Sequence, residues 1–216
     1  MITLYHCSSA RSFRPLWMLE ELRLSYELIM LPFPPRVHMK DYLAVNPLGT
    51  IPAFFDGAVH MTESSAICQY LAVRYGGNSG LAVGEDEPDY GGFLNALHFG
   101  EATLTFPQTL VLRYGQLEAD ERRQPQVVDD YARWFWGRLR AVESKLSGHD
   151  YMCADRFTAA DISVGYALML AQRLDLDERF GENVSRYWQR LASRPAYLRA
   201  LERQAVETRT LQGADQ

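Results

Sequence analysis

The chain has 216 residues, with 22 basic and 27 acidic side chains and a formal net charge of −5. A hydrophobic content of 47% excludes a chain that is disordered throughout, and the acidic balance disfavours a nucleic-acid-binding protein, which usually carries a basic surface. The longest stretch without a charge, residues 42–55, contains two prolines and is shorter than the roughly 20 apolar residues of a membrane helix, so we expect no membrane span.

The cysteines and histidines give no sign of a disulfide framework or a metal site. Cys7, Cys68 and Cys153 are an odd set without a Cys-x-x-Cys spacing, and the five histidines are scattered. We therefore expect no bound metal. The lack of a disulfide framework indicates the reducing cytosol, so we expect a cytoplasmic protein. No basic-then-apolar leader precedes the first apolar run, so we also expect no signal peptide.

The first part of the chain begins with a predicted βαβ unit. The run Ile2-Thr3-Leu4-Tyr5 favours a strand, and Pro15 suits the first turn of a helix that continues to about Leu24. Residues 26–31 predict a second strand. Strand, helix and strand within about 30 residues indicate two parallel neighbouring strands.

A hairpin and a helix are predicted to complete this domain. Residues 37–44 follow a proline-rich break and predict a short irregular helix. Asp56-Gly57 between two apolar runs is a strong hairpin signal. A further helix should begin at Ser64 and end at Gly76-Gly77. Residues 1–78 are thus predicted to form a small four-stranded α/β domain.

The remainder of the chain predicts a linker and an all-helical domain. Residues 79–89 are rich in glycine and acidic groups and indicate the linker. Residues 90–216 show helical patterns only, including a long helix from Tyr90 to about Gly115 with a kink at Pro107. Residues 158–161 have the order of a helix capping box, which we interpret as structural.

Two segments of the first domain are candidate ligand-binding sites. Pro52 belongs at the start or the edge of a strand; if its peptide bond is cis, the N–H and C=O of Ile51 face outward and can pair with an extended ligand. Ser64 is a good helix cap, but a helix N-terminus also attracts a carboxylate, and Glu63 beside it can pair with an amine.

The loop from Cys7 to Ser12 follows the first predicted strand. In open α/β sheets, ligands bind beyond the carboxyl ends of the strands, so the hydroxyls and the thiol of this loop are candidate ligand contacts. A polar loop with one capping serine is the simpler interpretation. A glycine-rich phosphate cradle is missing from the sequence, so nucleotide binding is disfavoured.

The order of these segments resembles a known family. ITLYHCSSARSFRPLW, PLGTIPAF, ESSAI and FTAADI occur in the order and spacing of the cytosolic glutathione transferases. The resemblance covers nearly the whole chain. It implies a thioredoxin-like N-terminal domain that binds glutathione and a helical C-terminal domain that contributes a site for an electrophile.

The resemblance also implies roles for individual residues. Pro52 would be cis, and the backbone of Ile51 would pair with the cysteinyl part of glutathione. Glu63 and Ser64 would hold the γ-glutamyl amine and carboxylate. The cations that family members often place near the glycyl carboxylate would be His38 and Lys40.

The resemblance implies that Ser9 is the catalytic residue, as in serine-type members such as the zeta class. A hydroxyl that donates to sulfur beside a helix N-terminus stabilises the thiolate, and Arg11 would add positive field. Omega-type members have a cysteine at that point, and Cys7 lies only two residues away. Cys7, Ser12 and a backbone amide therefore remain alternatives for activating the thiol.

The second substrate is expected to be an apolar electrophile bound between the domains. Its candidate contacts are Phe13, Phe106 and Tyr114, although aromatic residues at helical spacing are more often core. The resemblance implies a homodimer and a role in detoxification. Alternative functions are a glutathione-dependent lyase, dehalogenase or isomerase, a disulfide reductase that uses Cys7, and a non-catalytic binding protein with this fold.

Overall fold

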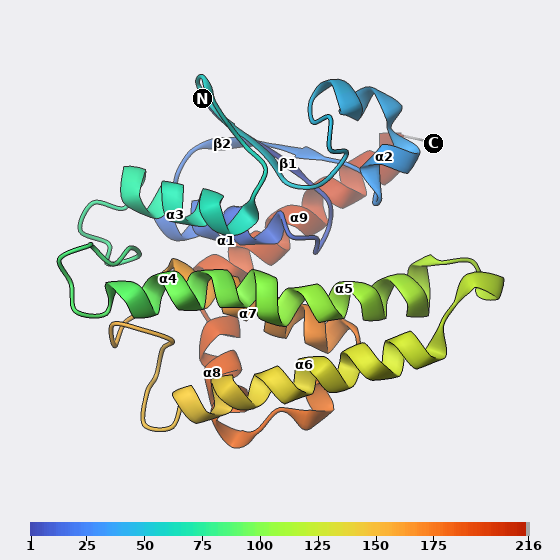
Figure 1. The fold of residues 1–216 in the computed structure, drawn as a ribbon. Helices are drawn as coiled ribbons and strands as arrows, with labels where there is room; N and C mark the ends of the chain where they lie inside the picture. Colours follow the sequence, from blue (N-terminus) through green and yellow to red (C-terminus); the bar gives the residue numbers. More distant parts are fainter. Residues whose placement is uncertain (215–216) are drawn as a thin grey trace. The chain divides into compact units, whose positions relative to one another are not determined.

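The computed structural model describes residues 1–214, with side chains described as far as Val206, and it divides into two compact units (Figure 1). The first unit joins Met1–Ala82 to Ala192–Gln216, and the second is Val83–Leu191. The boundaries predicted from the sequence differ from this division at the C-terminal end. The last helix belongs with the sheet because it packs against the first helix, a contact that no local sequence pattern reveals.

The first unit contains a four-stranded sheet in the order β2-β1-β3-β4. β1 (Ile2–His6) and β2 (Tyr26–Met30) are parallel, which confirms the predicted βαβ unit. β3 (Ala53–Asp56) is antiparallel to both β1 and β4 (Val59–Met61). Gly57 turns the predicted hairpin with a φ of 59°, a conformation that glycine adopts without a steric penalty.

The register of the strands brings four connecting segments to one edge of the sheet. His6 pairs with Met30, so the chain leaves β1 and β2 at the same edge. Tyr5, one residue earlier, pairs with Ala53, so the turn that precedes β3 lies at that edge as well. β4 is antiparallel to β3 and therefore ends beside the start of β3. Both segments in which the sequence predicts ligand contacts, and the loop after β1, meet there.

Three helices of the first unit pack together. α1 (Phe13–Leu22) contacts both α3 (Ser64–Tyr75) and α9 (Pro195–Ala214). Tyr197 of α9 packs its ring edge-on against Trp17 and Phe13 of α1, with ring centroids 4.9 and 5.6 Å away. Arg194 and Arg199 form ion pairs with Glu21 and Glu20, which lie on α1, at 2.7 and 2.9 Å. These contacts fix α9 on α1.

The regular elements of the second unit are all helices, with no strand among its described residues, as predicted. The helix expected from residue 90 begins as α4 (Tyr90–His98) but opens into a π-helical stretch (Phe99–Thr105) before α5 (Phe106–Leu112) and a second π-helical stretch (Arg113–Leu117). The wide turns end where Pro107, which has no N–H to donate, enters the first turn of α5. The predicted kink at Pro107 is therefore a change of helix type.

The remaining elements of the described chain complete the two units. The first unit also contains α2 (Pro35–His38) and a short 3₁₀ helix (Lys40–Ala44). The second contains α6 (Pro125–Lys145), α7 (Ala159–Arg173), α8 (Glu182–Ala192) and two 3₁₀ turns (Asp120–Arg122 and Asp177–Arg179). Across residues 1–214, none of the helices combines the length and apolar character that crossing a membrane requires.

Helix α7 is the buried centre of the second unit, as its apolar pattern predicts. The capping box at its start is confirmed: Ala160 N–H donates to the Thr158 hydroxyl, and the Asp161 carboxylate accepts from Thr158 N–H at 2.8 Å. The π-helical stretch Phe99–Thr105 lies so close to α7 that a Cβ at Gly100 would be 2.6 Å from the backbone of Ser163. Only glycine permits this approach.

Candidate functional site

The loop after β1 holds Ser9 in an unusual backbone conformation. Ala10 N–H donates to the Cys7 carbonyl at 3.1 Å, which closes a tight turn. Ser9, inside this turn, has a φ of 55°, in the left-handed region that residues with a Cβ rarely occupy. Its side chain is largely buried. The loop therefore presents Ser9 in one fixed position.

A network of buried polar side chains forms hydrogen bonds with this loop. The side-chain oxygen of Gln204, on α9, accepts from Ser9 N–H at 2.9 Å and lies 3.1 Å from Nε2 of His6. His6 Nδ1 lies 2.7 Å from the Ser12 hydroxyl, which also accepts from Cys7 N–H at 3.3 Å. The side chains of Gln204, His6 and Ser12 are all buried.

The protonation of His6 follows from these contacts. Burial lowers the pKa of His6 from 6.5 to about 4, so the ring is neutral near pH 7. Because the amide oxygen of Gln204 can only accept, the single ring proton lies on Nε2. Nδ1 then accepts from the Ser12 hydroxyl. The network thus has one consistent set of proton positions.

Cys7 is not a thiolate in this setting. The side chain is completely buried, and its Sγ lies 3.6 Å from the carbonyl oxygen of Pro32. Burial raises the pKa of the Cys7 thiol to about 12. A nucleophilic cysteine needs the opposite perturbation, so this environment disfavours the reductase alternative.

The turn before β3 offers a backbone pairing site. The Ile51–Pro52 peptide bond is cis, as the resemblance implies. Within residues 1–206, neither the N–H nor the C=O of Ile51 takes part in a hydrogen bond. The Thr50 carbonyl, in contrast, accepts from the Tyr42 hydroxyl at 2.7 Å and from the Asn46 amide at 2.8 Å. The turn is therefore firmly held while the peptide groups of Ile51 remain available.

The start of α3 is an uncapped helix N-terminus next to a buried cation. Glu63, and not Ser64 as predicted, occupies the cap position, and its side chain makes no capping hydrogen bond. Ser64 is the first helical residue, and its hydroxyl accepts from Nη1 of Arg14 at 3.0 Å. Arg14 is completely buried in α1, whereas Glu63 is exposed. The first-turn amides of α3, a hydroxyl and a buried guanidinium together suit a carboxylate ligand.

Two further basic residues follow β2, whose end lies at the same edge of the sheet. His38 ends α2, and Lys40 begins the following 3₁₀ helix. Both side chains are exposed. Their predicted contact with an anion stays a prediction.

Comparison with known proteins identifies the family. Residues 8–74 match the model of the glutathione S-transferase N-terminal domain, and residues 120–195 match that of the C-terminal domain. Glutathione S-transferase 3 of Zea mays is 30% identical over 83% of this chain and 83% of its own. The chain belongs to the glutathione transferase family.

Two other relatives support membership of the glutathione transferase family. Glutathione S-transferase 3 of Schizosaccharomyces pombe is 28% identical, covering 98% of this chain and 91% of its own. The structure of a sphingomonad glutathione S-transferase in complex with glutathione is 25% identical and superposes with a TM-score of 0.82, covering 94% of this chain and 98% of the other. The family and the predicted fold are thus established.

The three residues predicted to contact a second substrate have different surroundings. Phe13 is completely buried between Trp17 and Tyr197 and is a core residue of the first unit. Phe106 and Tyr114 belong to the second unit, where Phe106 is half-exposed beside Tyr131 at a ring distance of 6.5 Å. Tyr114 is partly buried. The complete burial of Phe13 argues against a substrate contact, whereas the roles of Phe106 and Tyr114 stay predictions.

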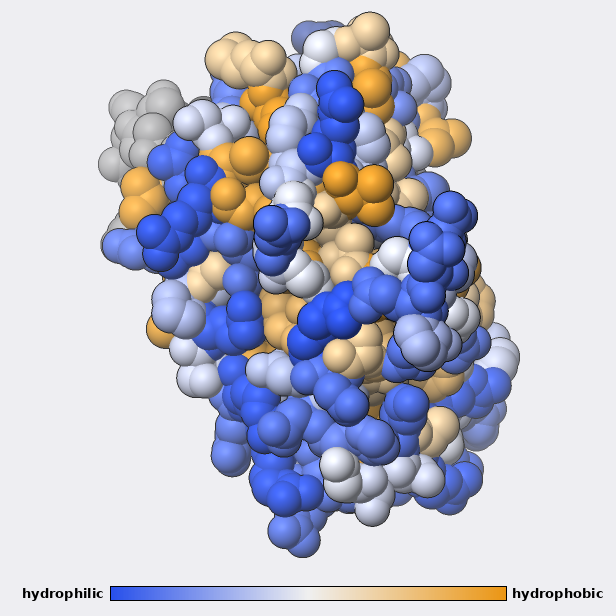
Figure 2. Space-filling view, turned by 90° about the vertical axis from the view of Figure 1, so that its left-hand side faces the viewer, coloured by the Kyte–Doolittle hydropathy of each residue, from blue (hydrophilic) through white to orange (hydrophobic). Residues whose placement is uncertain are grey.

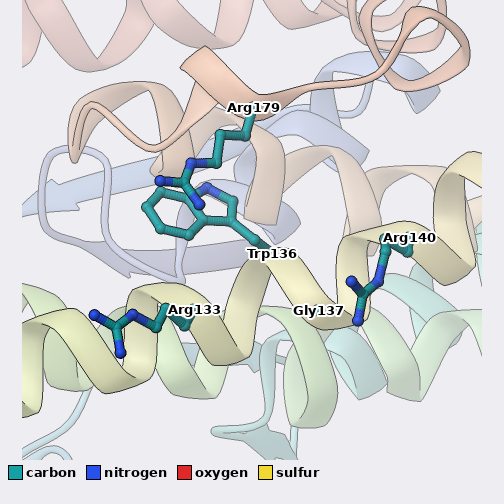
Figure 3. Close-up of a pocket in the computed structure, with 5 residues that line it drawn as sticks. All are labelled: Arg133, Trp136, Gly137, Arg140 and Arg179. Atoms are coloured by element: carbon teal, nitrogen blue, oxygen red, sulfur yellow. The ribbon is translucent and has the colours of Figure 1, made fainter.

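An open pocket of about 320 Å³ lies on the second unit (Figure 3). Arg133, Trp136, Gly137 and Arg140 of α6 line it together with Arg179, whose guanidinium stacks 3.8 Å above the Trp136 ring. None of the residues predicted to bind glutathione or the electrophile lines this pocket.

Sequence reasoning missed three residues that support the candidate glutathione site. Arg14 stands in the run Phe-Arg-Pro-Leu-Trp, where a cation within an apolar helical pattern is a usable signal of burial. His6 ends a strand and faces the loop that follows it. Gln204 lies 195 residues away from Ser9, in a helix of mostly polar sequence, and carried no signal.

Proposed function

We propose that this member of the family is a glutathione transferase enzyme that activates the thiol of glutathione for attack on an apolar electrophile. The observation that carries the proposal is the convergence of three binding elements at one edge of the sheet. These are the fixed Ser9, the unpaired peptide groups of Ile51 and the uncapped start of α3.

Each element matches a part of the tripeptide. The N–H and C=O of Ile51 would pair with the cysteinyl backbone like an added strand. The first-turn amides of α3, with Ser64 and the buried charge of Arg14, would bind the γ-glutamyl carboxylate, and Glu63 its amine. His38 and Lys40 would face the glycyl carboxylate. The sphingomonad relative in complex with glutathione supports this choice of ligand.

Ser9 would supply the chemistry. Its hydroxyl donates a hydrogen bond to the sulfur of bound glutathione, which favours the thiolate over the thiol, and the thiol proton passes to solvent. The thiolate then forms a C–S bond with an electrophilic carbon, and the electron pair leaves with a leaving group or moves into a conjugated system. The protein otherwise orients the two reactants, with Phe106 and Tyr114 as contacts for the electrophile.

We also propose that the protein works as a cytoplasmic homodimer in the detoxification of such electrophiles. β4 and α3 expose the apolar side chains of Val59, Val73 and Tyr75. Figure 2 shows apolar residues among hydrophilic ones in the upper part of the face that it presents. A second subunit would bury such side chains. Measurement of the molar mass in solution tests this part of the proposal.

The enzymatic part is tested by comparing Ser9→Ala with Ser8→Ala in a conjugation assay against a panel of aromatic halides and conjugated carbonyl compounds. Ser8 is the exposed neighbour of Ser9 and serves as the matched control. Loss of one preorganised hydrogen bond to a developing anion lowers turnover by about 100-fold, so Ser9→Ala should show that loss with little change in KM for glutathione. Unchanged turnover would assign the activation to another group.

A further inference from the structure

We propose that Gln204 is a positioning residue for the thiol chemistry, which it controls through Ser9. The inference rests on the proposed function, because it assigns Ser9 the hydrogen bond to the sulfur. It adds a residue from the last helix of the chain to a site otherwise built from the first 64 residues.

The first contact fixes the backbone of Ser9. Gln204 Oε1 accepts from Ser9 N–H at 2.9 Å, and Ser9 is held in the left-handed conformation with a φ of 55°. A serine leaves this region unless its surroundings stabilise it. The acceptor on Gln204 is such a stabilising contact, and the peptide that it binds sets the direction of the Ser9 side chain.

The second contact concerns the hydroxyl itself. Nε2 of Gln204 donates to Oγ of Ser9 at 3.4 Å. In this contact Ser9 is the acceptor, so its own proton is not used there and stays directed to another acceptor. A hydroxyl that accepts a hydrogen bond also becomes a stronger donor. The amide of Gln204 thus favours donation from Ser9 to an acceptor such as a thiolate.

The backbone N–H of Ser9 fixes the orientation of the Gln204 amide. Because this N–H can only donate, the group 2.9 Å away on Gln204 must be the oxygen, and the amide nitrogen then faces Ser9 Oγ. The same oxygen lies 3.1 Å from Nε2 of His6, so the neutral ring donates from Nε2 and its Nδ1 accepts from the Ser12 hydroxyl. A flipped amide would place a donor against the Ser9 N–H.

The position of Gln204 does not depend on these contacts alone. The ion pairs of Arg194 and Arg199 with α1, and the packing of Tyr197, hold α9 independently. Replacing Gln204 by methionine, a side chain of similar length without polar groups, should therefore leave α9 in place. The variant removes the acceptor for Ser9 N–H and the donor to Ser9 Oγ together.

The experiment measures the pKa of the thiol of bound glutathione from the ultraviolet absorbance of the thiolate against pH, together with turnover. We expect Gln204→Met to raise this pKa by about 1 and to lower turnover near neutral pH about 10-fold, with KM for glutathione within about 2-fold. Glu202→Met, at an exposed position of the same helix, is the matched control and should behave like wild type.

Two further variants separate positioning from folding. Gln204→Glu keeps an acceptor for Ser9 N–H but loses the donor to Ser9 Oγ and adds a negative charge that disfavours a thiolate nearby, so its thiol pKa should lie above that of wild type although the backbone of Ser9 stays held. In a Ser9→Ala background, Gln204→Met should cause no additional loss, because its effect passes through Ser9.

The outcomes distinguish this inference from the proposed function. If Gln204→Met lowers thermal stability but leaves the thiol pKa and turnover unchanged, Gln204 is structural and the positioning role is overturned. The role is also overturned if the losses in Gln204→Met and Ser9→Ala are additive. If wild type binds no glutathione, the proposed function fails, and the inference fails with it.

Discussion

The buried histidine His6 makes stability depend on pH in a way that can be calculated. Burial lowers its pKa to about 4 in the folded chain, whereas the unfolded chain titrates at the ordinary value of 6.5. Below pH 6.5 the unfolded state binds a proton that the folded state excludes. The stability that His6 contributes is therefore present above pH 6.5 and is lost as the pH falls toward 4. At about 1.4 kcal/mol per pH unit, the free energy of unfolding falls by about 3 kcal/mol over this window.

The assay compares urea unfolding of wild type and His6→Gln at several pH values between 7 and 4. Glutamine does not titrate, so the variant should be less stable at pH 7 but should lack the histidine part of the acid loss. The difference in free energy of unfolding between the two proteins should shrink by about 3 kcal/mol between pH 7 and pH 4.

The matched control is His98→Gln, which changes an exposed histidine of α4 and should follow wild type at every pH. Parallel stability curves for His6→Gln and wild type would refute the argument, because they would mean that His6 titrates alike in the folded and unfolded states.

Two further predictions concern the second unit and use urea unfolding as the measurement. Asp161→Ala should cost about 3–5 kcal/mol, since the buried carboxylate accepts from the Tyr187 hydroxyl and from two backbone N–H groups that would lose their partner; a loss below 1 kcal/mol would contradict this reading. Gly100→Ala should cost about 1–3 kcal/mol because its Cβ would meet the backbone of Ser163. Gly91→Ala, where the added Cβ meets nothing within 4 Å, should instead be stabilising by about 0.5–1 kcal/mol; equal effects of the two substitutions would show that the close approach is unimportant.

Local patterns predict the elements of this fold well. Asp56-Gly57 predicts the hairpin because few residues adopt positive φ, and Thr158 with Asp161 predicts the start of α7 because hydroxyl and carboxylate satisfy amides on either side of it. The βαβ unit predicts that β1 and β2 end at the same edge of the sheet. The pairing of β3 with β1, which brings the turn before β3 to that edge, was seen only in the structure.

Contacts between distant segments were not accessible in the same way. α9 belongs with the sheet through packing and ion pairs to α1, and Gln204 reaches Ser9 only because of that packing. Phe13 has the spacing of a pocket residue as well as that of a core residue, and only the position of Tyr197 decides between them. The helix begins at Ser64 as predicted, but the predicted capping role of Ser64 is wrong, because its hydroxyl accepts from Arg14 and Glu63 occupies the cap position.

The central claim, that the edge of the sheet binds glutathione, is tested most directly by calorimetric titration. Wild type should bind glutathione with micromolar to millimolar affinity, and Ser64→Ala should weaken binding by about 10-fold, the value of one hydrogen bond to a charged group. Ser144→Ala, at an exposed position of α6, should bind like wild type. Absence of binding by wild type, or equal affinity for Ser64→Ala and Ser144→Ala, would contradict the account.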